Sequence, residues 1–303
     1  MSGSVAAACR AVLLADKHRD KVRLARATAR EWSRGLLAHE FDVAMPDAPA
    51  RPSRPELLPP NRMPKRGRGG SERGRAAMLH ALAHVEYSAI DLAFDVAGRF
   101  GGLFPRSFVD DWLSVGADEA MHFAILDRRL KTLGTAYGKL PAHAGLWEAA
   151  GATAHDAAAR LAVVPMVLEA RGLDVTPDTV ARFEAAGDAA SARILQRIYT
   201  DEIRHVGFGA KWFGYLCANQ SIPPAPRWQH LVRMHFRGKL KPPFNDSARA
   251  RAGLTRDFYE PLAAEGAGGS HHHRLASGGA ADQVGDGLSR SVHTDAALRT
   301  GVR

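Results

Sequence analysis

Two short segments of the sequence repeat one pattern of metal-binding residue types. Glutamate oxygens and histidine nitrogens are common ligands of divalent metal ions. Side chains three positions apart lie on one face of a helix, so both members of a Glu-x-x-His pair reach the same ion. We therefore expect each segment to bind metal from a helix. The segments are Asp118-Glu119-x-x-His122 and Asp201-Glu202-x-x-His205.

A single glutamate precedes each segment at the same distance. Glu86 lies 33 residues before Glu119, and Glu169 lies 33 residues before Glu202. One Asp-Glu-x-x-His segment arises easily by chance, but two copies with equally spaced upstream glutamates do not. The pattern predicts two related helix hairpins that supply two Glu and two Glu-x-x-His sets, as in di-metal carboxylate bundles. The alternative is a set of surface salt bridges on ordinary amphipathic helices.

The expected ligands lie on apolar helix faces. Glu86 is in line with Leu82 and Ile90, and Glu169 is in line with Met166. A carboxylate on a core-facing stripe costs several kcal/mol if it stays ionised and unpaired. Because no lysine or arginine lies in these stripes, the sequence predicts that a pair of divalent metal ions neutralises the carboxylates.

Two aspartates adjoin the expected ligands. A ligating histidine usually donates its second ring N–H to a carboxylate. We predict this role for Asp118 and Asp201, with Arg204 as a candidate partner of one of them. The alternative is that both aspartates are helix-surface charges.

Other polar residues lie close to the ligands in sequence. His84 is two positions from Glu86 and hence on another face, which favours a supporting role over ligation. Tyr87 and Tyr199 are candidate redox-active or hydrogen-bonding tyrosines, with plain packing as the alternative. Pro165 is expected to kink the third long helix and to open a pocket there. The run 271–273 is either a metal-binding or an incidental histidine tract.

Helical patterns dominate the chain, because it is rich in alanine and poor in alternating β-branched runs. This predicts an all-α fold, namely a four-helix bundle over residues 73–220. Glycines mark the expected helix ends. The long helices are expected at 73–100, 105–133, 143–171 and 189–218, with a short helix near 176–186.

The flanks of the predicted bundle differ from it in composition. Residues 1–45 are expected to form an N-terminal helical extension, and residues 46–72 a connector rich in proline and arginine, because proline breaks helices. Residues 221–262 are expected to wrap the bundle. Residues 263–303 are rich in Gly, Ala and Ser, which predicts a disordered tail.

Charge and cysteine content narrow the classes of function. Residues 1–75 carry 16 Lys and Arg against 8 Asp and Glu, whereas residues 76–220 carry 13 against 17. The basic flanks fit either a nucleic-acid or anionic-surface contact or simply solvated arginine-rich loops. Two cysteines in 303 residues exclude a disulfide scaffold and a cysteine zinc site. With no 18-residue apolar run and no signal peptide, the sequence predicts a cytoplasmic protein without membrane contact.

Several stretches of the chain resemble a known family. They include GRAAMLHALAHVEYSAIDLAFD from Gly74 and YTDEIRHVGFGAKWF from Tyr199. Between Gly74 and Asn245 the chain resembles the bacterial ferritin-like family catalogued as domain of unknown function 455, while the N-terminal helix and the tail fall outside the likeness. That family is similar to di-iron tRNA hydroxylases that act on methylthio-isopentenyl-adenosine. The resemblance implies an oxygen-activating di-iron site with six ligands, which are Glu86, Glu119, His122, Glu169, Glu202 and His205.

The sequence thus predicts a di-iron oxidoreductase that uses O₂ to hydroxylate or oxidise an organic substrate. Oxygen and nitrogen ligands without sulfur suit two iron ions, with manganese or zinc as alternatives. An external reductant or reductase is required, because no flavin or iron–sulfur motif is visible. The substrate is left open between a small molecule and a tRNA nucleoside, as is the oligomeric state. The alternative function is a non-enzymatic ferritin-like protein that binds metal or detoxifies iron or peroxide.

Overall fold

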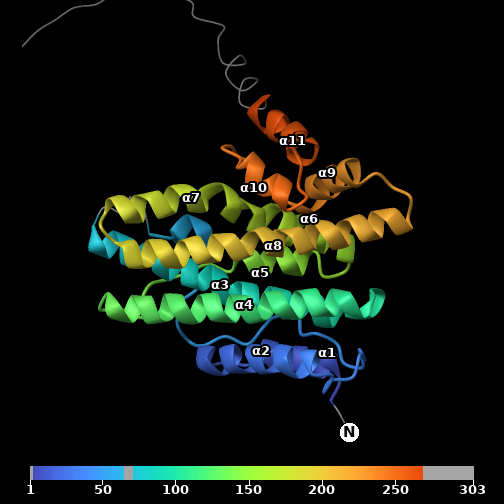
Figure 1. Ribbon diagram of the computed structural model, residues 1–303, viewed down its shortest axis with the longest axis horizontal. Coiled ribbons are helices and arrows are strands. Elements are labelled where there is room, and N and C mark those ends of the chain that lie inside the picture. The colour runs from blue at the N-terminus through green and yellow to red at the C-terminus, as the bar shows by residue number, and fades with distance from the viewer. Residues whose placement is uncertain (1–2, 65–70, 269–303) are drawn as a thin grey trace, which may run out of the picture. The chain divides into compact units, whose positions relative to one another are not determined.

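The structure is a computed structural model that describes residues 3–64 and 71–268 (Figure 1). Helices and their connections make up these residues. No β-strand occurs in the described ranges, where the only extended pairings are the isolated bridges Ser4–Ala38 and Leu57–Ala142. The predicted all-α fold is confirmed. It follows from the apolar residues at helical spacing, which each helix buries against its neighbours.

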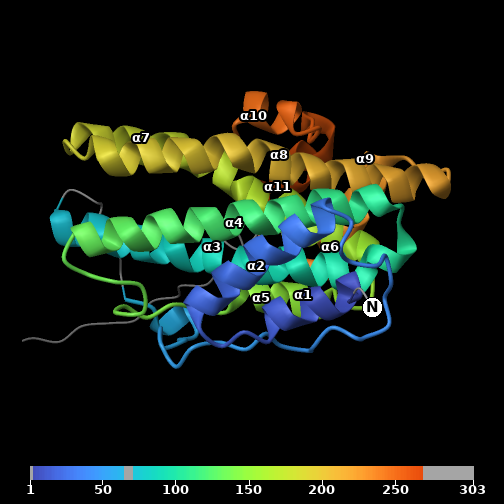
Figure 2. The same ribbon diagram turned by 60° about the horizontal axis from the view of Figure 1, so that its bottom comes forward.

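Two helical hairpins carry the expected metal ligands. In the first, a short turn joins two long helices that pack against each other. In the second, a segmented helical run packs against one long helix. The hairpins lie side by side in both views, with the last helix of the first against the last helix of the second (Figures 1 and 2). Their elements are α3 (Glu72–Phe100), η2 (Gly101–Leu103) and α4 (Arg106–Thr132), then α6 (Ala157–Val163), η3 (Val164–Glu169), α7 (Ala170–Ala185) and α8 (Ala189–Asn219).

Side-chain caps set the starts of two of these helices. The hydroxyl of Ser71 accepts a hydrogen bond from the backbone N–H of Gly74 at the start of α3. The carboxylate of Asp188 does the same for the N–H of Ser191 in α8. Such caps satisfy backbone donors that have no partner in the first helical turn. The boundaries predicted for α3, α4 and α8 agree with the structure to within one residue.

The predicted third helix, 143–171, is wrong in its boundaries. The chain forms α5 (Gly145–Ala152), leaves the helix, and begins again at α6, where the Asp156 carboxylate caps two backbone N–H groups. The helix then continues through Gly172 to Ala185 and absorbs the short helix expected at 176–186. It ends before Gly187, whose φ of 75° is left-handed. Gly172 has no left-handed backbone and lies within α7, so it gave a false stop signal.

The N-terminal helices cover one side of the first hairpin. Helix α1 (Val5–Leu13) packs on α3, and α2 (His18–Ser33) packs on α4 (Figure 2). Lys21 of α2 is fully buried and forms an ion pair with Asp91 of α3. The connector beyond contains the short η1 (Pro60–Arg62), and its residues 65–70 lie outside the described part. The division into an extension and a connector stays a prediction.

Three helices follow the second hairpin. Helix α9 (Pro224–His235) packs on α6, where the indole N–H of Trp228 donates to the Ala162 carbonyl at 3.1 Å. Helix α10 (Asp246–Arg251) packs on α7 and α8. Helix α11 (Arg256–Gly268) includes residues 263–268, which were expected to belong to the tail. Residues 269–303, including the histidine run, lie outside the described residues.

Candidate metal centre

Four side chains from three helices meet in the interior. One oxygen each of Glu86, Glu119 and Glu202 and one ring nitrogen of His122 lie within 4.8 Å of one another. Glu86 and Glu119 are buried, at 5% and 1% exposure. Among the described residues, no lysine or arginine forms an ion pair with these glutamates. Clustered carboxylates with histidine nitrogen are suited to a divalent metal, so this cluster could hold a metal ion.

Glu119 lies between the two histidines. Its Oε1 is 2.9 Å from Nδ1 of His205, and its Oε2 is 3.4 Å from Nδ1 of His122. Each histidine also approaches a second carboxylate: His122 Nδ1 is 3.2 Å from Glu86 Oε2, and His205 Nδ1 is 3.4 Å from Glu202 Oε1. Glu119 is therefore the carboxylate that the two histidines have in common, while Glu86 and Glu202 each approach one histidine.

Glu169 reaches the same region from the fourth helical run. Its side chain lines a cavity together with Glu86, Glu119 and Glu202. Its Oε2 atom is buried and has no hydrogen-bond partner among the described residues. A buried carboxylate oxygen without a partner is costly, unless a metal or water satisfies it.

A π-helical turn places Glu169 at this position. Helix α6 widens into η3, which contains Pro165 and ends at Glu169. Pro165 has no N–H to donate, and an inserted π turn is a common response to such a defect. The turn fits against α8 because Gly209 has no side chain, since a Cβ there would lie 2.6 Å from Cβ of Pro165. The structure places a π turn at Pro165, whereas the predicted kink and the opening of a pocket by this proline stay predictions.

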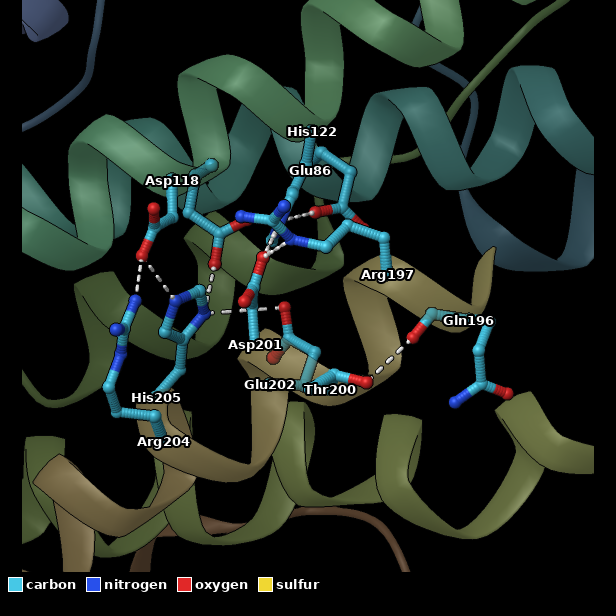
Figure 3. Close-up of polar contacts among 11 residues, drawn as sticks. Glu86, Asp118, His122, Gln196, Arg197, Thr200, Asp201, Glu202, Arg204 and His205 are labelled. Atoms are coloured by element: carbon cyan, nitrogen blue, oxygen red, sulfur yellow. Dashed lines mark hydrogen bonds and ion pairs between the residues drawn. The ribbon is translucent and has the colours of Figure 1, made fainter. Parts of the chain in front are cut away.

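The two aspartates pair with the histidines crosswise (Figure 3). Asp201 of α8 lies 3.0 Å from Nε2 of His122 on α4, and Asp118 of α4 lies 3.3 Å from Nε2 of His205 on α8. An Nε2–H that donates to an aspartate leaves the lone pair on Nδ1, which is the nitrogen facing the glutamates. The aspartates therefore set the tautomer in which both histidines can bind metal.

Two arginines anchor these aspartates from the surface. Arg204 forms an ion pair with Asp118 (Figure 3). Arg197 donates from Nε to Asp201 at 2.7 Å. Sequence reasoning singled out Arg204 but missed Arg197, although its spacing of four residues from Asp201 on one helix was a usable signal.

Two buried atoms near the cluster have no hydrogen-bond partner among the described residues. Nδ1 of His205 is buried and makes no hydrogen bond, although it faces two carboxylates. Together with Oε2 of Glu169, it is a ligand atom without a hydrogen-bond partner in a region of concentrated negative charge. Bound cations would satisfy both atoms and would neutralise the glutamates.

The electrostatics of the glutamates reflect burial and crowding. Burial and the charge of Glu119 raise the pKa of Glu86. Burial, with the charges of Glu202 and Glu119, raises the pKa of Glu169 to about 8. Burial would also raise the pKa of Glu119, but the charges of His205 and His122 outweigh it and lower that pKa. Glu119 is thus the glutamate most strongly held as a carboxylate.

Burial acts on the pKa of a histidine in the opposite direction to its effect on a glutamate, because it disfavours the charged form of each. Burial alone would lower the pKa of His122, but its contacts with Glu119 and Glu86 raise it to about 11. The pKa of His205 is raised for the same reason, by Glu202 and Glu119 against the effect of burial. The neighbouring glutamates thus favour the protonated, positively charged form of both histidines.

An apolar cavity of about 230 Å³ adjoins the carboxylates. Its walls include Leu82, Leu168 and Ile198. Val85 and Val175 also line it and are 42% and 39% exposed, so they mark the side on which the cavity approaches the surface. The cavity gives a small apolar group a place beside the cluster.

Three other predicted residues have partners away from the cluster. Nδ1 of His84 is 2.9 Å from the hydroxyl of Tyr137, and its Nε2 is 3.2 Å from the carbonyl of His143. Tyr87 is buried, with its ring 5.2 Å from that of Phe123. Tyr199 accepts a hydrogen bond from the side-chain amide of Asn245. Their suggested roles beside the metal stay predictions.

None of the described helices is long and apolar enough to cross a membrane.

The fold and the site define a helical protein with a buried glutamate and histidine cluster that could hold a metal ion. Comparison with known proteins gives the family. The chain belongs to the family described as "Protein of unknown function (DUF455)", which matches residues 14–260. The match begins well before Gly74, so α2 (His18–Ser33), which was expected to fall outside the shared part, lies within it, whereas α1 (Val5–Leu13) precedes the match.

A relative in Haemophilus influenzae, described as an uncharacterized protein, is 43% identical over 216 residues, which cover 68% of this chain and 74% of the relative. No solved structure matches the chain.

Proposed function

We propose that this protein is a ferritin-like di-iron oxidoreductase that uses O₂ to hydroxylate or oxidise an organic substrate. The four helical runs would form its four-helix bundle. One Glu comes from each of α3 and η3, and one Glu-x-x-His from each of α4 and α8, which is the ligand distribution of di-iron carboxylate proteins. The six proposed ligands are Glu86, Glu119, His122, Glu169, Glu202 and His205.

One observation carries the proposal: the carboxylate of Glu119 lies between the Nδ1 atoms of two histidines from different hairpins. A structural salt bridge would need only one cation for one carboxylate. Here, three glutamates share two histidines, and each histidine is oriented from behind by an aspartate. This arrangement supports a centre for two ions rather than a set of core ion pairs.

The protein residues would have distinct tasks. Iron would supply O₂ activation, and oxygen and nitrogen ligands also admit manganese or zinc. Asp118 and Asp201 hold the imidazole rings and their tautomers. The apolar side chains of the cavity would exclude water and would position the group to be oxidised.

The reaction would need further components. An external reductant or reductase would return the metal to its reduced form. The substrate would place a small apolar group in the cavity of about 230 Å³, as part of a small molecule or of a tRNA nucleoside.

Metal analysis of wild-type protein and of Glu119→Ala tests the metal centre. Protein produced in iron-rich medium should contain about two iron ions per chain, and Glu119→Ala should contain fewer than one. Glu184→Ala, an exposed site on α7, is the matched control and should keep the wild-type content. Less than one metal per chain in the wild type, with no change in Glu119→Ala, would refute the proposal.

Exposure of the loaded protein to O₂ with a reductant then separates two outcomes. Oxidation of an added organic substrate supports the oxidoreductase. Iron oxidation that no substrate alters indicates the alternative, an iron-detoxifying protein.

A further inference from the structure

An arginine-rich surface covers the seam between α4 and α8, on the side that faces α2. Two grooves lie along it. One, of about 830 Å³, is lined by Arg26 and Arg30 of α2 and by Arg204 of α8. The other, of about 380 Å³, is lined by Arg128 of α4 and by Arg193 and Arg197 of α8. We call these six arginines the arginine seam.

Four members of the arginine seam have no counter-charge. The side chains of Arg26, Arg30, Arg128 and Arg193 are exposed. Within residues 3–64 and 71–268, none of the four forms an ion pair. Arg23 of the same helix α2, by contrast, lies 3.7 Å from Asp20. The seam therefore presents an excess of positive charge that no described carboxylate neutralises.

The acidic residues at the seam are already engaged. Asp118 pairs with Arg204 and contacts His205, and Asp201 pairs with Arg197 and contacts His122 (Figure 3). Asp110 in the first groove accepts the indole N–H of Trp32 at 2.7 Å. These carboxylates are not free to bind the four unpaired arginines.

The chemistry of the seam favours phosphate groups as its ligand. A guanidinium group matches phosphate oxygens with two parallel hydrogen bonds, and arginine is over-represented where phosphate is recognised. The interface core of a protein partner is typically apolar and aromatic. Arginines recur along both grooves, with Leu113 buried in the first and Ile125 and Ile194 in the lining of the second. Neither groove offers an exposed aromatic side chain, because Trp32 is buried beneath Arg106.

The length of the seam favours a chain of phosphates over a single nucleotide. Arg193 and Arg204 are 11 residues apart on α8, which corresponds to roughly 16 Å along the helix. Successive phosphates of one strand of a duplex are about 3.4 Å apart along the axis, so several phosphates would span that length.

We propose that the arginine seam binds the phosphodiester backbone of a nucleic acid. Arg26 and Arg30 would hold phosphates in the first groove, and Arg128 and Arg193 in the second. The seam shares no lining residue with the cavity beside the glutamates. Nucleic-acid binding at the seam is therefore independent of the chemistry at the glutamates. The proposal holds whether or not the centre is a di-iron oxidoreductase.

Fluorescence anisotropy with a labelled 20-nucleotide oligouridylate tests the binding. The logarithm of the binding constant should fall with the logarithm of salt concentration, with a slope of about −0.7 for each phosphate contact. Arg26→Gln with Arg30→Gln should weaken binding roughly tenfold and make the slope less steep by about 1.4. Arg128→Gln with Arg193→Gln should act in the same way.

Arg23→Gln with Arg34→Gln is the matched control, because it removes the same charge from α2 and from the residue that follows its last turn, outside both grooves. This pair should leave the slope unchanged. An equal loss in the control pair, or no loss in either groove pair, would overturn the proposal. So would displacement of the oligonucleotide by pyrophosphate or polyglutamate at equal charge concentration, since that would indicate a small-anion or acidic-protein site.

All three double variants are checked for folding by circular dichroism and for iron content. The proposal is supported if the two groove pairs fold normally, keep their iron content and lose oligouridylate binding. Wild-type protein that binds oligouridylate but no iron would support the arginine seam and contradict only the di-iron function.

Discussion

His122 and Asp201 are hydrogen-bond partners although they are 79 residues apart, with 3.0 Å between Nε2 and Oδ2. The reciprocal contact joins His205 to Asp118, with 3.3 Å between Nε2 and Oδ2. Each aspartate therefore orients the histidine of the opposite hairpin. This crosswise arrangement ties the geometry of each half of the proposed centre to the packing of α4 against α8.

Asp201→Asn should weaken metal binding by about 10–100-fold, because an amide does not hold the His122 tautomer as a carboxylate does. Titration of the metal-free protein with Co²⁺, followed by its absorption bands, measures the change. Asp111→Asn is the control, since Asp111 lies on α4 and contacts Lys211 and Trp212 but neither histidine. Equal Co²⁺ affinities in wild type and Asp201→Asn would contradict the orienting role.

Metal removal should destabilise the folded protein, since the glutamates then lose their counter-ions. At a free metal concentration 100 times the dissociation constant, the bound ion adds about 2.7 kcal/mol to the free energy of unfolding. Thermal unfolding with and without a chelator measures the difference. In Glu119→Ala the chelator should have little effect, and a shift as large as in the wild type would show that the stabilising ion binds elsewhere.

Gly209→Ala should destabilise the protein by about 1–3 kcal/mol, because the new Cβ would overlap the ring of Pro165 in η3. The displaced turn carries Glu169, so the metal content should fall as well. Urea unfolding and metal analysis test both effects. Gly214→Ala is the control on the same helix, since no atom lies within 4 Å of its Cβ position, and it should be stabilising by roughly 0.5–1 kcal/mol. Similar behaviour of the two variants would refute the close contact.

Asp188→Asn should lower the free energy of unfolding at neutral pH. It should also make that free energy fall less steeply as the pH is lowered. Burial would raise the pKa of Asp188, but hydrogen bonds from Ser191 and the charge of Arg129 lower it. A lowered folded-state pKa gives stability that is present above the unfolded-state pKa of about 3.9. That stability is lost as pH falls through the folded-state pKa.

Asparagine keeps the helix cap, so the difference between wild type and Asp188→Asn isolates the charge. Urea unfolding from pH 7 to pH 2 should show the two free energies of unfolding converging in acid. Asp178→Asn, at an exposed position on α7, should run parallel to the wild type. A constant offset between wild type and Asp188→Asn over the whole range would contradict the assignment.

The repeated spacing in the sequence was enough to select the side chains that the structure brings together. Residues three apart share a helix face whatever the packing, so Glu119 with His122 and Glu202 with His205 were predictable as pairs. The ends of α3, α4 and α8 were predictable as well, because capping residues and glycines act locally. The third helix was not, because Gly172 signals a stop only if the backbone turns left-handed there, and packing keeps it helical.

The sequence by itself determined the all-α class, the three regular long helices and the faces that carry the glutamates and histidines. These features depend on helix periodicity and on interactions within a few residues. Only the tertiary structure decided that Asp118 and Asp201 cross to opposite histidines, that Glu119 lies between Nδ1 atoms of both, and that Pro165 widens its helix against Gly209. The physical reason is that each of these contacts joins two helices, so it depends on their rotation and separation, which spacing along one chain does not specify.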